Sequence, residues 1–246
     1  MIVLALFVGT HALTTPLVSD VPPTPSEAVI LQFSADASAD DQRATADIIS
    51  KRLNALGMTP DIRLNPGSDG NPATIRVLLP GGDDFTSTAA LIRQPGDFEL
   101  VDFSGMEAYE YQDRGLWTTH EAEIMAVRPP ELWVRPDTNQ PFTTILDNTH
   151  LMQAQAIRDD TMGTWTVHVV FDQEGGGLLG AFTAAHIGDM MAIVVDGYVL
   201  STPVIQSMIS GEAVIQGNFV ESEARALAAK IGFGALPVPL ELVSIS

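Results

Sequence analysis

In the first hundred residues, the spacing of apolar residues alternates between the period of a β-strand and the period of an α-helix. Residues 28–33 are rich in branched side chains, which is typical of a β-strand. Ser38 and Asp41 then have the spacing of a helix N-cap, and Gly57 follows where that helix is expected to end. The apolar residues that share one face of this predicted helix are Ala46, Ile49, Leu53 and Leu56.

The next four elements are predicted as two strands, a helix and a strand, at 59–64, 74–79, 84–93 and 97–103. The run 65–72 between the first two is rich in turn-forming residues. The resulting order β-α-β-β-α-β is that of the ferredoxin-like, split βαβ arrangement. The sequence therefore predicts an α+β fold in which 97–103 is the last strand of this unit.

The second half of the chain predicts another α+β unit. Residues 104–143 show little periodicity and are predicted as an irregular excursion between two subdomains. Asp196-Gly197 between two apolar runs is a strong signal for a two-residue β-hairpin. The other elements expected here are a strand at 164–171, helices at 173–187 and 220–231, and a strand at 239–243. We expect this closing strand to lie in the same sheet as the strand 28–33 or its neighbours.

The apolar run 2–8 at the N-terminus predicts a signal sequence or a membrane anchor. It is long enough for the apolar part of a signal but shorter than the roughly 20 residues of a membrane span. No Lys or Arg precedes Arg43, so the basic start of a signal is missing. The alternative is a cytosolic protein whose first strand is apolar. With the proline-rich linker 21–25, residues 1–25 are assigned to a leader, and the rest is expected outside the cytoplasm, secreted or anchored to the membrane by the N-terminus.

The charge of the chain limits its partners. It has 12 basic and 31 acidic residues, which gives a formal net charge of −19. A surface this negative repels phosphate backbones and argues against a nucleic-acid partner. Cysteine is absent, which excludes disulfides, thiolate metal sites and cysteine nucleophiles.

No catalytic motif stands out in the sequence. The histidines lack the spacing of a metal site. Gly175-Gly176-Gly177 lacks the Lys-Ser/Thr of a phosphate-binding loop, and no serine lies in a Gly-x-Ser-x-Gly motif. We therefore predict no enzyme activity, no catalytic residue, no metal site and no cofactor.

Several short motifs follow one another in a fixed order along the chain. They are Arg52-Leu53-Asn54-Ala55-Leu56-Gly57, Ile75-Arg76-Val77-Leu78-Leu79-Pro80-Gly81, Val169-Val170-Phe171-Asp172, Asp196-Gly197 with Ser201 and Pro203-Val204-Ile205, and Gly234-Ala235-Leu236-Pro237. Together they resemble the extracytoplasmic domain of SecD, a subunit of the bacterial protein-export translocase. The resemblance covers about residues 28–246 and is weakest between 104 and 145.

Two features of the SecD family are missing from this sequence. No Gly-Leu-Asp-Leu-x-Gly-Gly segment precedes Ala28, and the membrane helices tied to proton-driven transport are not present. The resemblance therefore implies the extracytoplasmic module and does not imply an export motor.

The resemblance also implies a division into two subdomains. The base is expected at 26–103 and 219–246, and an inserted α+β head at 104–218. In the family the head moves relative to the base, binds emerging polypeptide and drives it outward. The expected partners are thus unfolded exported polypeptide and other Sec translocase subunits. The alternative is a stand-alone secreted or anchored binding or structural module without a transport role.

Two sets of candidate residues follow from this resemblance. If the head binds polypeptide, the candidate contacts are Leu200, Pro203, Val204, Ile205 and Met208. The alternative is that these side chains form the core of the head. The predicted hinge residues, where the chain would cross between base and head, are Ser104 and Asn218.

Overall fold

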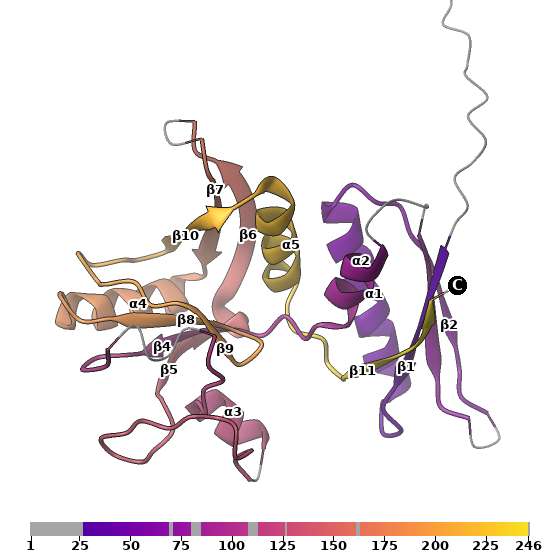
Figure 1. The fold of residues 1–246 in the computed structure, drawn as a ribbon, viewed down its shortest axis with the longest axis horizontal. Helices are drawn as coiled ribbons and strands as arrows, with labels where there is room; N and C mark the ends of the chain where they lie inside the picture. Colours follow the sequence, from indigo (N-terminus) through magenta and orange to yellow (C-terminus); the bar gives the residue numbers. More distant parts are fainter. Residues whose placement is uncertain are drawn as a thin grey trace, which may run out of the picture.

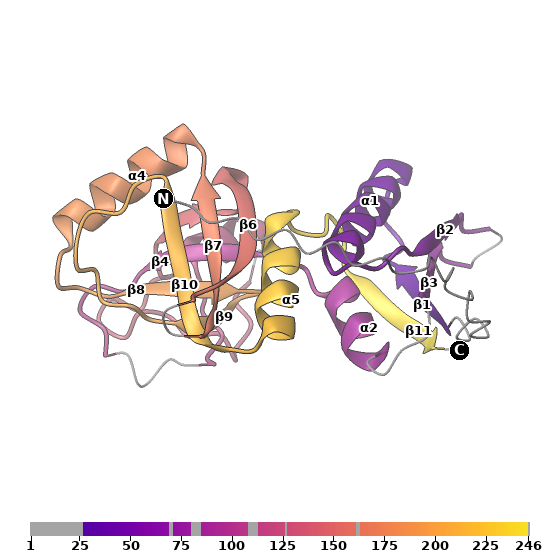
Figure 2. The same cartoon turned by 90° about the horizontal axis from the view of Figure 1, so that it is seen from above.

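The chain forms two bodies that lie side by side along the longest axis of the molecule (Figures 1 and 2). The computed structural model describes residues 27–68, 71–79, 85–107, 113–125, 127–160 and 163–245. The predicted leader and linker, residues 1–25, lie outside the described residues. None of the helices in the described part is both long and apolar enough to cross a membrane.

The base is a four-stranded antiparallel sheet with two helices on one face (Figure 1). Its elements are β1 (Glu27–Phe33), α1 (Ala39–Ala55), β2 (Asp61–Asn65), β3 (Thr74–Leu79), α2 (Phe85–Arg93) and β11 (Leu240–Ile245). The strand order is β11-β1-β3-β2, and all neighbours are antiparallel. The pairing of the closing strand with the first strand is confirmed, since Phe33 lies opposite Leu240. The element order is the predicted β-α-β-β-α-β, with β11 as its last strand.

Helix α1 begins and ends at the residues that the sequence predicted. The N–H of Asp41 donates to Ser38 Oγ (3.1 Å), and the N–H of Ser38 donates to Asp41 Oδ2 (3.0 Å), which is a capping box. The helix ends before Gly57, whose φ is +81°. The fully buried Ile49 and Leu53 of this helix pack on the core face of the sheet.

The predicted assignment of strand 97–103 to the base is wrong. This strand, β4 (Phe98–Asp102), pairs with strands of the other body, and β11 occupies its expected place in the base. The reason is its pattern of burial. Phe98 and Leu100 lie in one core and Val101 in another, so β4 needs cover on both faces. The base sheet has helices on one face only.

The head is built from two sheets and three helices among the described residues (Figure 2). The elements are β4, α3 (Thr119–Ile124), β5 (Thr144–Asp147), the 3-10 turn η2 (Asn148–His150), β6 (Leu151–Arg158), β7 (Trp165–Phe171), α4 (Gln173–Ala185), β8 (Met191–Val195), β9 (Tyr198–Ser201), β10 (Glu212–Phe219) and α5 (Glu221–Gly232). One sheet has the order β5-β4-β8-β9 and the other β10-β7-β6. The larger core lies between these sheets and α5, while a smaller one lies under the irregular segment that contains α3.

Helix α5 belongs to the head, which differs from the predicted boundary at residue 219. Its buried Ala224, Leu227 and Ile231 pack in the same core as Val167 and Val169 of β7. The opposite side of α5 lies against α1 and α2 of the base. Helix α5 therefore completes the core of the head with its apolar side and contacts the helices of the base with its other side (Figure 2).

Candidate functional site at the crossings between base and head

The chain passes between base and head twice, and the two passages touch. It leaves the base through residues 94–97, between α2 and β4, and returns through residues 233–239, between α5 and β11. The N–H of Leu236 donates a hydrogen bond to the carbonyl of Pro95 across 2.8 Å. The two crossings therefore form one connection.

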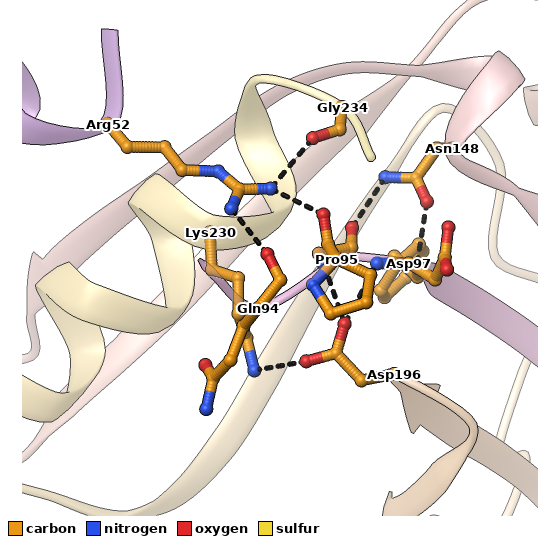
Figure 3. A network of polar contacts seen from close by, with 10 residues as sticks. Arg52, Gln94, Pro95, Asp97, Asn148, Asp196, Lys230 and Gly234 are labelled. Carbon is orange, nitrogen blue, oxygen red and sulfur yellow. Dashed lines mark hydrogen bonds and ion pairs between the residues drawn. The ribbon is translucent and has the colours of Figure 1, made fainter. Parts of the chain in front are cut away.

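Arg52 on α1 binds both crossings from the base side (Figure 3). Its side chain is fully buried and donates to the carbonyl oxygens of Gln94 (2.7 Å), Pro95 (2.6 Å) and Gly234 (3.0 Å). Burial lowers the pKa of Arg52 to about 10, while the nearby carboxylate of Asp196 acts in the opposite direction. The guanidinium is therefore charged at neutral pH, and its planar fork of donors serves three carbonyls at once.

Asp196 binds the first crossing from the head side (Figure 3). It is the first residue of the predicted Asp-Gly turn, which joins β8 and β9, and its φ is +52°. Its carboxylate accepts hydrogen bonds from the N–H groups of Gly96 (2.6 Å) and Asp97 (3.1 Å). It also forms an ion pair with Lys230 Nζ on α5 at 2.9 Å. One side chain thus joins a hairpin turn, the first crossing and α5.

Gly96 lies between these two charged side chains. Its φ of +85° is in the left-handed region that favours glycine. A Cβ at this position would lie 2.6 Å from the carbonyl oxygen of Lys230 and would overlap the guanidinium of Arg52. Asn148 donates to the carbonyl of Gly96 (3.2 Å) and accepts from the N–H of Phe98 (2.6 Å). The close approach of base and head at this point requires glycine.

We call this set of contacts the crossing network. Its residues are Arg52, Gln94, Pro95, Gly96, Asp97, Asn148, Asp196, Lys230 and Gly234. Hydrogen bonds and one ion pair make up its chemistry, and no group of three or more His, Asp or Glu side chains in the described part of the chain is arranged to hold a metal ion. The arrangement can hold the head in one orientation on the base.

The sequence analysis did not predict this network, although Arg52 and Asp196 both lie in the short motifs that resemble SecD. The two residues belong to different motifs and are 144 positions apart. The motifs carried no hint that these residues approach the same backbone segment. An arginine on the core side of a predicted helix, one position before the apolar Leu53, was the available signal for a buried cation.

The predicted hinge residues lie inside the head, away from both crossings. Ser104 follows β4, and its carbonyl accepts a hydrogen bond from Arg135 (2.9 Å). Asn218 is an exposed residue of β10. The two residues do not lie where the chain crosses between the bodies, because β4 and α5 belong to the head, and their role as hinges stays a prediction. The chain crosses instead at 94–97 and 233–239.

The structure separates the predicted polypeptide contacts into three kinds. Pro203, Val204 and Met208 are exposed, Val204 at 53% and Met208 at 61%. Leu200 is half-buried against the larger core of the head. Ile205 is only 2% exposed and belongs to that core. The side chain of Ile205 is therefore covered in this conformation, which favours the alternative that it belongs to the core of the head.

Three carboxyl groups with raised pKa values lie at or beside the crossing network in the head, and Glu99 among them is buried. Glu99 on β4 is 1% exposed and accepts a hydrogen bond from Thr144 Oγ1 (2.7 Å). Burial raises the pKa of Glu99, and burial likewise raises the pKa values of Asp97 and Glu121. The nearby imidazole of His120 favours the charged form of all three and so acts against this shift.

The comparisons with known proteins point to one family. A family model described as "SecDF, P1 head subdomain" matches residues 133–238, a range that includes α5. The protein translocase subunit SecD of Dictyoglomus turgidum is 30% identical over 205 residues, which cover 83% of this chain and 41% of that protein. SecD of Aquifex aeolicus is 31% identical over 207 residues, which cover 83% of this chain and 39% of that protein.

The chain carries a SecD extracytoplasmic domain. It spans about two fifths of the length of these SecD relatives, at 41% and 39%. The crystal structure of SecDF in its super-membrane-facing form matches 91% of this chain with a TM-score of 0.64 and 27% identity, over 30% of the SecDF chain. A structure of SecDF, a membrane component that enhances protein export, matches 89% of this chain with a TM-score of 0.62 and 27% identity, over 99% of that chain.

The resemblance to SecD and the α+β fold predicted from the sequence are thus confirmed. The relatives are described as protein translocase subunits, and one of the matching structures as a membrane component that enhances protein export.

Proposed function

We propose that this SecD domain holds unfolded exported polypeptide on the exposed apolar surface of its head, and that the crossing network sets the orientation of the head on the base. Two structural features support this proposal in addition to the similarity to SecD. One is an exposed apolar patch on the head, and the other is the set of contacts at the crossings.

The apolar patch is the observation that carries the proposal. Ile187, Val204 and Met208 are exposed at 61%, 53% and 61%. Residues 188–190 run beside 203–205, because the N–H of Gly188 donates to the carbonyl of Ile205 (2.8 Å) and that of Ile205 donates to the carbonyl of Asp189 (2.8 Å). Three large apolar side chains on one loop region are the kind of surface that an unfolded chain with apolar residues can contact.

The patch rests on a rigid support. The buried Ile205 anchors its centre in the core of the head. Thr183 on α4 accepts a hydrogen bond from the N–H of Ile209 (2.9 Å). Gly176 lets the loop approach α4 closely, because a Cβ there would lie 2.9 Å from the backbone nitrogen of Gly211. The glycine-rich helix thus holds the loop against the head while Val204 and Met208 stay exposed.

The crossing network supports the second part of the proposal. Both passages contain a glycine in the left-handed region, Gly96 at +85° and Gly234 at +83°. A change in head orientation would be absorbed by the dihedral angles of these few residues, as in other hinges. It would also break the bonds that Arg52 donates to both passages. We propose other Sec translocase subunits as the partners of this movement.

Binding of an unfolded protein tests the proposal. A fluorescent, permanently unfolded protein is titrated with the domain, and we expect weak affinity, on the order of micromolar, since a transport cycle requires release. The double variant Val204→Asp/Met208→Asp should weaken binding at least about tenfold. Val214→Asp, at a residue 45% exposed on β10, is the matched control and should bind as wild type. Absence of wild-type binding at roughly millimolar concentration would refute the proposal.

A further inference from the structure

One edge of β6 lies open beside a groove. β6 is the outer strand in the order β10-β7-β6, so no described strand pairs with its second edge. A cavity of about 570 Å³ lies there, lined by residues 152–156 of β6, by α5 and by Ala55 of α1. Successive side chains of a strand point to opposite faces. A cavity that touches this whole run of residues therefore follows the edge of the strand and not one of its faces.

The edge of β6 carries little side-chain protection against strand pairing, although α5 packs against this strand and its Gly232 lies close to Ala154. Natural edge strands are blocked by lysine, proline or inward-pointing charges, or are covered by a helix. Strand β6 has neither Lys nor Pro, and its single charged residue, Arg158, is the last one. Every second residue along this edge directs its N–H and C=O groups away from β7. Those groups are the ones that an extended polypeptide backbone recognises.

The groove has room for such a backbone. The residues that line it on α5 and on the core side of β6 are small, namely Ala154, Ala156, Ala228, Ala229 and Gly232. Two larger apolar side chains stand at its sides, Met152 at 68% exposure and Phe233 at 38%. The volume lies within the range of cavities that hold ligands in proteins.

Charge favours one kind of polypeptide. Arg225 is the charged residue in the lining, and its guanidinium is paired with Glu221 at 2.8 Å. The groove therefore offers no unpaired positive charge, while the chain as a whole carries −19. At long range the net charge of the whole molecule attracts a basic segment and repels an acidic one.

We propose that an extended, basic segment of unfolded polypeptide binds in this groove by adding a strand to the open edge of β6. Main-chain hydrogen bonds would supply most of the affinity and tolerate many sequences. The proposal takes its ligand class from the proposed function but names a surface separate from Ile187, Val204 and Met208. Because Ala55 belongs to the base, a strand in the groove would contact both bodies at once.

The test uses a short disordered peptide of alanine, valine and lysine in three forms. One form is unmodified, one is N-methylated at every second amide, and one is N-methylated at every amide. Alternate methylation leaves one edge of the peptide intact, so this form should bind like the unmodified peptide. Full methylation removes both edges and should weaken binding about tenfold or more. Hydrogen exchange should slow at residues 152–156 when the unmodified peptide is bound.

A protein variant locates the site. Ala55 is exposed, so Ala55→Trp should fill the groove without disturbing a core and should weaken binding about tenfold. Asn54→Trp is the matched control on the same helix, at an exposed residue outside the lining. If the fully methylated peptide binds as well as the unmodified one, strand addition is refuted. If Ala55→Trp is silent while Val204→Asp/Met208→Asp abolishes binding, this inference fails and the proposed function stands. If the wild type binds neither the peptide nor the unfolded protein, both fail.

Discussion

Arg52 donates a hydrogen bond to the carbonyl of Gly234 across 3.0 Å, which joins the first helix of the base to the segment by which the chain returns from the head. The same guanidinium nitrogen donates to Pro95 on the outgoing segment at 2.6 Å. One buried cation therefore links residues 182 positions apart.

Replacing Arg52 tests the importance of this link. Arg52→Met keeps the length of the side chain but removes the donor of Gln94 and Gly234 and leaves Pro95 with only the N–H of Leu236, so the free energy of unfolding should fall by about 2–4 kcal/mol. Denaturant unfolding measures this. Arg63→Met is the control, because Arg63 pairs with Asp61 on an exposed strand and should change stability by no more than about 0.5 kcal/mol. Equal effects of the two variants would show that the buried arginine has no special role.

Gly96 and Gly57 form a matched pair of glycines. Both have left-handed φ angles, +85° and +81°, but a Cβ at Gly57 would meet nothing within 4 Å. Gly57→Ala should therefore cost only the backbone term, about 1 kcal/mol. Gly96→Ala should cost clearly more, because its Cβ overlaps the crossing network. Thermal unfolding of both variants checks this, and a smaller loss for Gly96→Ala would contradict the packing at the crossing.

Glu99 makes stability depend on pH. Its pKa is raised by burial above the ordinary 4.5, so the folded protein binds this proton more tightly than the unfolded chain does. The contribution to stability is fully present below 4.5 and is lost as the pH rises through the raised folded value. Glu99→Gln keeps an acceptor for Thr144 and removes the titration.

The expected result is a gain in stability that grows with pH. Glu99→Gln should match the wild type below about pH 4 and exceed it increasingly as the pH rises toward neutrality. Asp97 and Glu121 have pKa values shifted in the same direction and remain in both proteins, so the shifts that burial causes in them are common to the two proteins. Urea unfolding at a series of pH values measures it. A difference that stays constant across the series would show that Glu99 does not titrate in this way.

The C-terminal strand should be essential to the base. Leu240 on β11 is 7% exposed and packs in the core of the base, whereas Leu242 is 39% exposed. Leu240→Ala should lower the free energy of unfolding by about 2–4 kcal/mol, and Leu242→Ala by less than about 1 kcal/mol. If both leucines could be replaced without loss, β11 would not be part of the folded base in solution.

Val204 and Ile205 are neighbours with opposite roles. Ile205→Asp places a charge in the core of the head and should destabilise it by several kcal/mol, about 3 or more. Val204→Asp changes an exposed side chain and should alter stability by no more than about 0.5 kcal/mol. Melting curves of the two variants separate these roles. A stable Ile205→Asp variant would mean that Ile205 is exposed after all.

The predictions that held were those that depend on neighbouring residues. Ser38 and Asp41 cap α1 through bonds within one turn, and Asp196-Gly197 forms the turn of a hairpin whose strands adjoin it. The predicted helix α4 forms despite its glycines, one of which, Gly176, lets the loop at Gly211 pack closely on it. The prediction that failed concerned partners far away in the sequence, namely the sheet that contains β4.

By itself, the sequence determined the order and type of the elements, the caps and turns, and the family, because periodicity and local hydrogen bonds are properties of short segments. The tertiary structure decided which strands share a sheet. β4 is apolar on both faces and fits only between two cores, while β11 completes the base from the far end of the chain. It also decided that Arg52 and Asp196 meet at the same crossing and that Ile205 is buried beside an exposed Val204. Such pairings depend on which surfaces remain to be covered once the whole chain has folded, and no short segment contains that information.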